Sequence, residues 1–430
     1  MTEKPPAVSI VVPLHNSSAH IGPIVDAIKA QTEGDFEAIL VDDGSTDETF
    51  ELAQAATEGD SRFVLLAQEN AGPGMARNAG LAVARGEWVL FFDVDDYPHE
   101  DLLEKALSRA QETGADIVVY GHDHQWASGG PSWPSHNRWD ASKLPEVFSP
   151  HDIADDLFGV LRNWPWDKMW RRQFLQDAGI SFPPLYRTED MPFTCLGLVD
   201  AKKISLLDDV LYTYRVGALV SSTQTLDSAP FDFFEACCLL KAGLEQRGLF
   251  ESYRRSYLQW VGTCVAVNLL GLRSPLVFEE VYGFMHEKGL GALGLNDGIG
   301  INGGDQGAYD LDEVRAKGGL QADGTLVGNS VLPPVEVSEY LEFGTKLRLG
   351  AAGSATDADV AVMVDIVRLF GPAQGAFLLM RCGQELRERD YAQELHRRDD
   401  IIRQYEDRID VLSNEGLRDY LKRKKNSPST

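Results

Sequence analysis

Three carboxylates stand close together directly after an apolar run. The run at 88–92 reads Trp-Val-Leu-Phe-Phe and predicts a buried strand, which Asp93, Asp95 and Asp96 follow. Carboxylates this close repel one another unless a positive charge lies between them. Magnesium or manganese would supply that charge, because both take oxygen ligands, usually one or two carboxylates together with substrate phosphates. A solvated acidic turn before the next helix would explain the same residues, and these residues alone leave both interpretations open.

Two further polar clusters follow predicted strands. The strand at 7–13 ends in Pro13, and the strand at 36–41 runs into Asp42 and Asp43. Strands alternate with amphipathic helices in this half of the chain, which predicts an α/β fold with a mainly parallel sheet and helices on both faces. Ligands bind beyond the carboxyl ends of the strands in such sheets. We therefore expect these clusters and the acidic cluster to meet at one edge of the sheet and form a site.

The remaining elements follow from hydrophobic periodicity. Short apolar runs predict strands, and apolar residues at intervals of three and four predict helices. The predicted strands are 7–13, 36–41, 63–66, 88–92, 116–120, 204–207 and 210–215, and the predicted helices are 18–31, one beginning near 74, 99–113, 191–199 and a longer helical region at 230–272.

Composition excludes several classes of protein. At 430 residues the chain exceeds the usual size of one core, so two or three domains are expected. A formal net charge of −26 argues against a nucleic-acid partner, which needs a basic face, but not against a nucleotide held through a cation. No apolar run reaches the roughly 20 residues that span a bilayer, and no signal peptide is visible. The five cysteines form no paired framework, so a cytoplasmic protein with reduced thiols is expected.

The C-terminal part of the chain divides into two predicted regions. Residues 226–383 are expected to form a helical and irregular domain, including a glycine-dense stretch at 288–330. Residues 384–425 predict a long amphipathic helix with a heptad pattern like that of a coiled coil. So narrow an apolar seam needs a partner, either a second copy of the chain in a homodimer or a groove on its own body. The basic tail at 422–425 is either a solvated terminus or a peripheral contact with the inner face of a membrane.

Six motifs stand in a fixed order along the first half of the chain. They are Val8-Ser-Ile-Val-Val-Pro-Leu-His-Asn16, Val41-Asp-Asp-Gly-Ser-Thr-Asp47, Asn70-Ala-Gly-Pro-Gly-Met-Ala-Arg-Asn-Ala-Gly80, Gly86-Glu-Trp-Val-Leu-Phe-Phe-Asp-Val-Asp-Asp96, Trp166-Asp-Lys-Met169 and Thr188-Glu-Asp190. Together they resemble glycosyltransferase family 2, whose members have the GT-A fold. The resemblance covers about residues 7–225 and implies a transferase domain at 1–225. It also implies an inverting, metal-dependent transfer of a sugar from a nucleoside-diphosphate sugar, with a UDP-sugar expected, to an acceptor hydroxyl in polysaccharide or glycoconjugate synthesis.

The resemblance implies roles on the donor side of the site. Asp43 matches the position that binds the nucleotide base, and Pro13 and His15 match the end of the first strand, which lines the same pocket. Asp95 matches the acid that touches the ribose or the metal ion. Arg77 matches a basic position near the nucleotide.

The resemblance also implies a metal ligand and a general base. Asp96 matches the ligand of Mg²⁺ or Mn²⁺ in the DXD motif, and Asp93 stays an alternative ligand because Asp93 and Asp95 spell the same pattern. Asp190 matches the base that takes the proton of the acceptor hydroxyl. A pKa raised by Glu189 or by partial burial would suit that task. A metal ion and a cation would stabilise the negative charge on the leaving diphosphate.

The chain departs from the common family pattern at two motifs. The usual Pro-x-Tyr-Asn has a histidine at position 15, and the usual Trp-Asn-Lys has an aspartate at position 167. For Lys168 and Arg215 two interpretations stay open: a contact with the diphosphate or the acceptor, or a surface cation or ion pair. His122 and His124 are expected to be ordinary residues of a strand end, although a metal site would also fit their spacing.

Two other functions remain open at this stage. A sugar-phosphate nucleotidyltransferase is also an α/β, metal-dependent enzyme, but the expected glycine-rich loop and basic residue after the first strand are missing. A non-catalytic scaffold with a degenerate transferase half would use the C-terminal helix to bind partners, and the intact acidic motifs argue against it. The expected partners of the transferase are a nucleotide-sugar donor and a glycan or lipid-linked acceptor.

Overall fold

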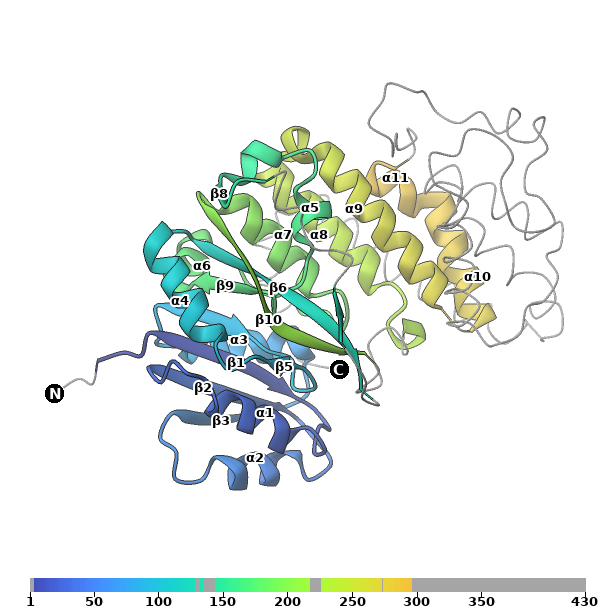
Figure 1. Cartoon of the computed structure of the whole chain (residues 1–430). Coiled ribbons are helices and arrows are strands. Elements are labelled where there is room, and N and C mark those ends of the chain that lie inside the picture. Colours follow the sequence, from blue (N-terminus) through green and yellow to red (C-terminus); the bar gives the residue numbers. More distant parts are fainter. Residues whose placement is uncertain (1–3, 128–131, 135–143, 217–225, 273, 296–430) are drawn as a thin grey trace. The chain divides into compact units, whose positions relative to one another are not determined.

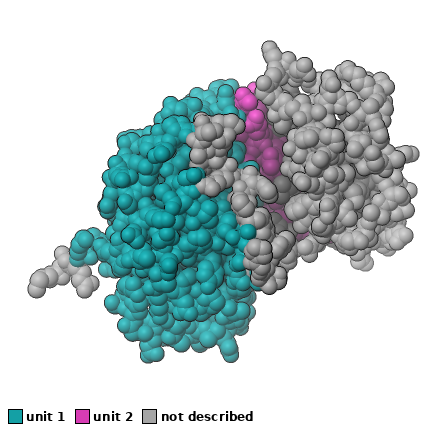
Figure 2. Space-filling view, in the orientation of Figure 1, with its two compact units in different colours: residues 1–221, 242–253, 417–430 teal, residues 222–241, 254–416 magenta. Residues whose placement is uncertain are grey.

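The computed structural model describes residues 4–127, 132–134, 144–216, 226–272 and 274–295 (Figure 1). These residues divide into two compact units. The first contains the described residues up to 216 together with 242–253, and the second contains 226–241 and 254–295 (Figure 2). The predicted helix at 384–425, its basic tail and most of the glycine-dense stretch lie outside the described residues.

One mixed sheet runs through the first unit. Its main path has the order β3-β2-β1-β4-β9-β6-β10-β5, with β7 beside β6 and β8 beside β10. Strands β3, β2, β1 and β4 are parallel to one another, and so are β6 and β10, whereas β9 lies antiparallel between β4 and β6. The bounds are β1 Val8–Leu14, β2 Phe36–Asp43, β3 Phe63–Gln68, β4 Trp88–Phe91, β5 Tyr97–Pro98, β6 Ile117–Trp126, β7 Trp133–Pro134, β8 Val147–Phe148, β9 Lys168–Arg171 and β10 Ile204–Val216.

The helices of the first half of the chain follow the strands in alternation, as the sequence predicts. They are α1 Ile21–Lys29, α2 Thr49–Thr57, α3 Pro73–Val83, α4 Leu102–Thr113, a 3₁₀ turn at Pro150–Ile153, α5 Leu157–Leu161, α6 Arg172–Ala178 and α7 Asp190–Asp200. The later helices are α8 Asp232–Gln246, α9 Phe250–Gly271, α10 Pro275–Phe284, a π-helical turn at Met285–Gly289 and α11 Leu290–Leu293. Helices α8 and α9 confirm the helical pattern predicted over 230–272.

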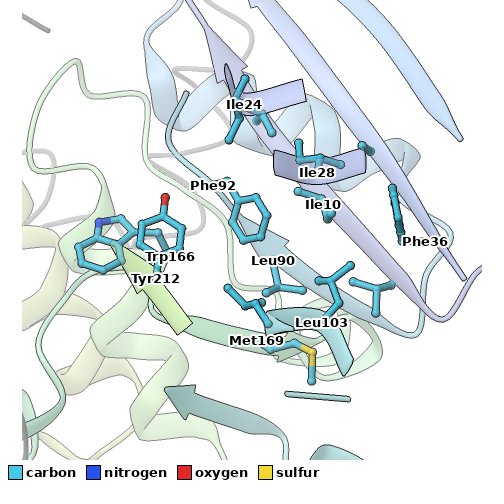
Figure 3. Close-up of a cluster of buried hydrophobic side chains, with 14 of the residues drawn as sticks. Ile10, Ile24, Ile28, Phe36, Leu90, Phe92, Leu103, Trp166, Met169 and Tyr212 are labelled. Atoms are coloured by element: carbon cyan, nitrogen blue, oxygen red, sulfur yellow. The ribbon is translucent and has the colours of Figure 1, made fainter. Parts of the chain in front are cut away.

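One face of the sheet packs against α1, α2 and α4. Alternate residues of β1 and β4, such as Ile10 and Leu90, meet Ile24 of α1 and Leu103 of α4, and all four side chains are fully buried (Figure 3). Alternation along a strand sends successive side chains to opposite faces, so the intervening residues face the other layer. The β-strand runs are apolar throughout because both faces of the sheet are covered.

The other face of the sheet carries α3 and α7. A Cβ added to Gly80 of α3 would lie only 2.4 Å from Cγ1 of Val11, so the glycine lets α3 rest directly on β1. Phe91 of β4 packs edge-on against Phe193 of α7, with the ring centroids 5.5 Å apart. These contacts fix α3 and α7, which carry two of the six motifs of the sequence.

The prediction of two strands at 204–207 and 210–215 is wrong, because β10 is one continuous strand. Its register with β6 shifts between Leu207 and Val210 and again between Val210 and Tyr212. Asp208 and Asp209 resemble a turn in the sequence, but the extra residues are accommodated as a bulge. Gly121 of β6 permits this bulge, since a Cβ there would lie 2.8 Å from the carbonyl oxygen of Asp209.

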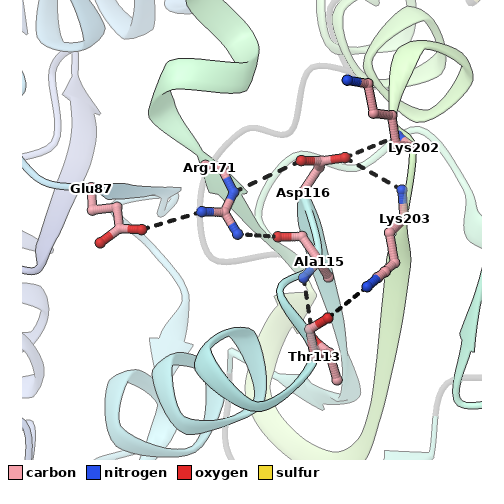
Figure 4. Close-up of polar contacts among 7 residues, drawn as sticks. All are labelled: Glu87, Thr113, Ala115, Asp116, Arg171, Lys202 and Lys203. Atoms are coloured by element: carbon pink, nitrogen blue, oxygen red, sulfur yellow. Dashed lines mark hydrogen bonds and ion pairs between the residues drawn. The ribbon is translucent and has the colours of Figure 1, made fainter.

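A polar network ties the strands together at the edge where β4, β6 and β10 begin (Figure 4). Arg171 at the end of β9 reaches Glu87 at 3.2 Å and donates to the Ala115 carbonyl oxygen at 2.8 Å. One oxygen of Asp116 accepts the backbone N–H groups of Lys202 and Lys203 at 2.9 and 3.3 Å. This network lies at the opposite end of the strands from the acidic motif, so it serves the fold and not the site.

The second unit is helical in its described part. Phe231 and Phe234 pack edge-on against Phe284 of α10, with ring centroids 5.3 and 5.1 Å apart. No helix among the described residues of the chain is long and apolar enough to cross a membrane. The described cysteines, Cys195, Cys237, Cys238 and Cys264, are free thiols.

Candidate active site

The carboxyl ends of β1, β2 and β4 lie at the same edge of the sheet, because these strands are parallel neighbours. His15 follows β1, Asp43 ends β2, and Asp93 to Asp96 follow β4. Pro13 lies beyond Val11, which is the last residue of β1 to pair with β4, so its missing N–H removes no bond from that ladder. The structure therefore brings the separated polar clusters to one edge, as the parallel topology predicts.

His15 is held by the neighbouring strand end. Its Nδ1 lies 2.9 Å from the carbonyl oxygen of Asp43, which can only accept, so Nδ1 carries the hydrogen. The lone pair of Nε2 then accepts from the side-chain amide of Asn16 at 3.1 Å, and the Asn70 amide lies 3.3 Å from both ring nitrogens. Asn16 has a φ of 46°, a left-handed conformation that asparagine tolerates better than most residues. The ring is thus oriented by its surroundings and presents a fixed tautomer to the edge.

Asp43 is buried and organises the turn that begins α3. One carboxylate oxygen accepts from Nε2 of Gln68 at 2.7 Å and from the N–H of Ala71 at 2.9 Å, and the other accepts from the N–H of Gly72 at 2.8 Å. Gly72 has a φ of 90°, which the turn requires and which other residues rarely adopt. A carboxylate has about four acceptor positions, so Asp43 retains one for a ligand.

The Asn70–Gly80 motif now has a physical explanation, one residue at a time. Gly74 lets the start of α3 approach the Thr-Glu-Asp motif, because a Cβ there would lie 2.8 Å from Cγ of Glu189. Asn78 pairs with the backbone of Phe182 in both directions, donating to its carbonyl oxygen at 2.8 Å and accepting from its N–H at 3.0 Å. Gly80 seats the helix on β1. The motif therefore fixes α3 to three separate parts of the site.

Arg77 lies inside this arrangement, between two carboxylates. Its two terminal nitrogens donate to Glu189 Oε1 at 2.7 Å and to Asp93 Oδ1 at 2.8 Å. Only 7% of its side chain is exposed, and its guanidinium lies 5.4 Å from the centre of the Phe182 ring. Burial acts to lower the pKa of Arg77, but the charges of Asp93 and Glu189 outweigh it and raise the pKa further. Arg77 is therefore permanently charged.

Asp96 is the most deeply buried acid of the DXD segment. Its Oδ1 accepts the backbone N–H of Arg215 at 2.8 Å, and its Oδ2 is buried and accepts no hydrogen bond from the described residues. Burial raises the pKa of Asp96 well above its usual value, and the charges of Asp93 and Asp95 add to that, against a smaller opposite effect of the Arg215 amide and the Tyr212 hydroxyl. A buried carboxylate oxygen without a donor is costly unless a proton or a cation occupies it. The acidic segment therefore fits a hard divalent cation.

Glu189 and Asp190 stand at the start of α7, where the positive end of the helix dipole favours acids. Thr188 before them has a φ of 57°, an uncommon conformation for a β-branched residue. Burial raises the pKa of Glu189, whereas Arg77 opposes the rise. Burial also raises the pKa of Asp190 to about 8, with Glu189 and Asp93 adding to it and Arg77 and Asn163 opposing. Asp190 remains partly exposed, whereas Glu189 is buried.

Lys168 and Arg215, for which the sequence left two interpretations open, have different surroundings in the structure. Lys168 is fully buried at the start of β9, and its ammonium group donates to Asp167 and to the carbonyl oxygen of Trp164 at 2.8 Å, so it forms an ion pair. Burial raises the pKa of Asp167 to about 6, and Lys168 opposes the rise. Arg215, in contrast, lies at the acidic segment through its backbone contact with Asp96.

His122 and His124 have aromatic neighbours. Their rings lie 5.6 Å apart, and His122 packs edge-on against Trp164 and Trp166 at 5.2 and 4.8 Å. In the part of the chain that the structure describes, no three His, Cys, Asp or Glu side chains are grouped so as to hold a metal ion by themselves.

Comparison with known proteins decides the family. The profile of glycosyl transferase family 2 matches residues 9–178. The putative glycosyltransferase EpsH of Bacillus subtilis is 30% identical over 254 residues, which cover 58% of this chain and 72% of EpsH. The chain belongs to glycosyltransferase family 2. Family membership makes it a transferase enzyme, in place of the nucleotidyltransferase and the scaffold that the sequence alone left open.

Two further similarities concern one staphylococcal protein. The present chain is 28% identical over 257 residues to the poly(ribitol-phosphate) β-N-acetylglucosaminyltransferase TarS of Staphylococcus aureus. The match covers 58% of this chain but only 42% of TarS. The crystal structure of TarS 1–349 in complex with UDP has a TM-score of 0.46 to this chain at 22% identity, over 66% of this chain and 88% of that one.

Several residues of the candidate site were not singled out from the sequence. Asn163 hydrogen-bonds to Asp190 and opposes the rise of its pKa, Phe182 lies beside the Arg77 guanidinium, and Gln68 donates to Asp43. Gln68 ends β3 at the same edge, so the carboxyl-edge rule could have predicted its place in the site. Asn163 and Phe182 come from loops without a motif, and only the folded chain reveals their contacts.

Proposed function

We propose that this glycosyltransferase moves a sugar from a nucleoside-diphosphate sugar, with UDP-sugars as the expected donors, to an acceptor hydroxyl with inversion at the anomeric carbon. The observation that carries the proposal is one cluster of acids with divided properties. Asp96 has a buried oxygen without a donor, and Asp190 is partly exposed with its pKa raised to about 8. The first suits a cation beside a diphosphate, and the second suits a general base.

The reaction needs one proton transfer and one displacement. Asp190 takes the proton of the acceptor hydroxyl as the acceptor oxygen forms a bond to the anomeric carbon. The bond from that carbon to the diphosphate oxygen breaks at the same time, and its electron pair leaves with the nucleoside diphosphate. With the pKa of Asp190 raised to about 8, only the ionised fraction of this carboxyl group can accept the proton, and that fraction grows as the pH rises.

A magnesium or manganese ion completes the proposal. Asp96 would hold it, with Asp93 as the alternative ligand predicted from the sequence, and Asp95 would touch either the ion or the ribose. When bound, the ion neutralises the negative charge that develops on the leaving diphosphate. The backbone N–H of Arg215 keeps the other oxygen of Asp96 in place, so the carboxylate keeps one fixed orientation toward the edge.

The nucleotide base would lie between β1 and β2. Asp43 has one acceptor position left for a base N–H, and His15, with its tautomer fixed by the Asp43 carbonyl group, and Pro13 would line the same pocket. Asp95 would meet the ribose or the ion. Histidine in place of the common tyrosine still offers a flat ring to the base.

The acceptor is proposed to be a glycan or a lipid-linked glycan. The name of TarS gives a poly(ribitol-phosphate) acceptor for that relative, and a cell-surface polymer is the corresponding class here. Residues 1–225 would form the transferase domain, 226–383 a second domain and 384–425 a helix for self-association or for a peripheral contact with the inner face of a membrane. Deleting residues after 384 should change the molar mass in light scattering and leave nucleotide binding intact.

A donor panel tests the proposal. Purified full-length protein is given UDP-, GDP- and dTDP-sugars with Mn²⁺, and release of the nucleoside diphosphate is measured with and without EDTA. Asp96→Ala should lose activity at least about tenfold, since metal ligands and their supporting contacts are worth at least that much. Asp60→Asn, at a surface ion pair with Arg62, is the matched control and should remain active. Activity that ignores both EDTA and Asp96→Ala would reject the metal-dependent mechanism.

A further inference from the structure

The sequence assigned Arg77 to the nucleotide and left Asp93 as an alternative metal ligand, but in the structure they bind each other. Arg77 donates to Asp93 at 2.8 Å and to Glu189 at 2.7 Å, and the side chains of Arg77 and Glu189 are exposed by only 7% and 9%. Both terminal nitrogens of the guanidinium donate to protein carboxylates, and each keeps a second N–H. With only 7% of the side chain exposed, a diphosphate has little access to those remaining N–H groups while Arg77 holds both acids.

We propose that Asp93, Arg77 and Glu189 form a positioning bridge, which ties the segment that carries Asp95 and Asp96 to the helix start that carries Asp190. The proposal rests on the proposed function, because it assigns those other acids to the cation and the acceptor proton. The bridge itself touches neither the donor nor the ion. It fixes the separation between the cation-binding acids and the base.

The three members of the bridge come from three elements that are anchored independently. Arg77 belongs to α3, which is seated on Val11 of β1 through Gly80. Asp93 follows β4, and its N–H donates to the Tyr212 hydroxyl at 3.1 Å. Glu189 lies directly before α7. A link between such anchored elements sets a distance, whereas a link on a mobile loop would not.

An aromatic layer supports the guanidinium. Phe182 lies 5.4 Å from the Arg77 guanidinium and stacks on Phe193 of α7 at 3.8 Å, and Phe91 of β4 packs edge-on against both rings. The rings thus connect β4 to α7, the same two elements that the bridge connects. Packed aromatic rings resist small shifts because protein interiors are close-packed.

Charge explains why an arginine is needed here even without a ligand. Asp93 and Glu189 lie near Asp190 and Asp96, so four carboxylates share a small, largely buried region. Removing one partner of a buried ion pair leaves an uncompensated charge, whereas neutralising the whole set often costs little. Guanidinium, unlike ammonium, can satisfy two carboxylates at fixed angles. Comparing single variants with a variant that neutralises all three residues therefore distinguishes a positioning role from a purely stabilising one.

Manganese and UDP binding test the assignment of Asp93 and Arg77. The full-length protein is titrated with MnCl₂ in the presence of UDP by calorimetry. Asp93→Asn should keep the Kd for Mn²⁺ within about threefold of wild type, whereas Asp96→Asn should raise it at least about tenfold. Equal losses in the two variants would make Asp93 a ligand and overturn the proposal. Arg77→Lys that binds UDP about tenfold more weakly, with unchanged thermal stability, would make Arg77 a donor contact and overturn it as well.

Kinetics test whether the bridge acts as one unit. Asp93→Asn and Glu189→Gln should each lower kcat about 100-fold, the loss expected from a misplacement of about 1 Å, with little change in the donor KM. The double variant should lose little more than either single variant, because each already breaks the same link. Independent losses that multiply would contradict a shared bridge. Asp60→Asn, which breaks the surface pair with Arg62, controls for charge removal.

A neutral triple variant separates position from stability. Arg77→Met with Asp93→Asn and Glu189→Gln removes all three charges, so its Tm should recover toward wild type relative to Arg77→Met alone. Its kcat should stay low, and recovery of kcat together with Tm would reduce the bridge to a structural ion pair. The Tm measurements need no ligand. Wild-type protein that binds neither Mn²⁺ nor UDP would therefore reject the proposed function, while the Tm values would still report on the bridge.

Discussion

Replacing Asp190 with asparagine is expected to remove activity and to increase stability at alkaline pH. Asparagine keeps the size of the side chain but cannot take the acceptor proton, so kcat should fall by about 10²–10⁴-fold. Burial, Glu189 and Asp93 hold the pKa of Asp190 at about 8 in the folded protein, far above the ordinary 3.8. The folded state therefore disfavours the ionised carboxylate, and the substitution removes that cost.

The sign and size of the effect follow from the two pKa values. Because the pKa is raised on folding, the folded state binds the proton more tightly, and wild-type stability falls as the pH rises from about 4 to about 8 and then levels off. The interval from 3.8 to about 8 sets an upper bound of about 6 kcal/mol. Asp190 is partly exposed, so water and the coupled acids reduce the cost, and about 1–3 kcal/mol is expected at pH 8. That corresponds to roughly 3–10 °C in Tm.

Thermal and urea unfolding of wild type and Asp190→Asn at pH 5 and pH 8 measure this difference. The variant should be the more stable protein at pH 8, with less than half that advantage at pH 5. Asp60→Asn serves as a control of opposite sign, because the hydrogen bonds and charge of Arg62 lower the pKa of Asp60 and its loss should destabilise. The reasoning fails if Asp190→Asn is less stable than wild type at pH 8, or if the difference does not depend on pH.

Three further outcomes check other parts of the structure. Asp116→Ala removes the acceptor of two backbone N–H groups and should cost about 1–3 kcal/mol in urea unfolding while the Kd for UDP stays unchanged. Gly80→Ala places a Cβ 2.4 Å from Val11 Cγ1 and should cost a similar amount, about 1–3 kcal/mol, by displacing α3, with reduced kcat as a consequence. In wild type the N–H groups of Ala71 and Gly72 donate to the two oxygens of Asp43; in Asp43→Asn one of them would face an amide NH₂ group, which cannot accept. Calorimetry should then show UDP binding at least about tenfold weaker.

The sequence predicted the parallel part of the sheet well because its signals are local. Apolar runs such as 7–13 and 36–41 alternate with helical periodicity, and the carboxyl-edge rule then places their polar ends together without any knowledge of long-range contacts. The antiparallel strand β9 was missed. It spans only Lys168–Arg171 and overlaps a motif that received a functional interpretation. So short a run contains no pattern that predicts its insertion between β4 and β6.

Partners within the site were less predictable than positions along the chain. Residue spacing placed Arg77 on a helix near the acids, but its contact with Glu189 spans 112 residues of sequence and depends on how α3 and α7 pack. The interpretations of Lys168 from sequence included a surface cation and an ion pair, and its fully enclosed side chain forms an ion pair with Asp167. A sequence pattern gives the side chain's type and element, whereas hydrogen-bond partners follow from packing.

The clustered carboxylates at the carboxyl edge of the sheet lower the stability of the folded protein, and contacts elsewhere in the first unit must offset that loss. Arg77 compensates Asp93 and Glu189, yet burial still raises the pKa of Asp96 and of Asp190, so both acids would gain free energy from a proton or a cation. Such sites persist because stability is supplied elsewhere. Here the apolar layer that packs β1 and β4 against α1 and α4, and the polar network around Asp116 at the opposite end of the strands, supply it (Figures 3 and 4). The proposed metal-bound diphosphate would bring positive charge to this edge, and its binding would relieve a cost that the folded protein otherwise carries alone.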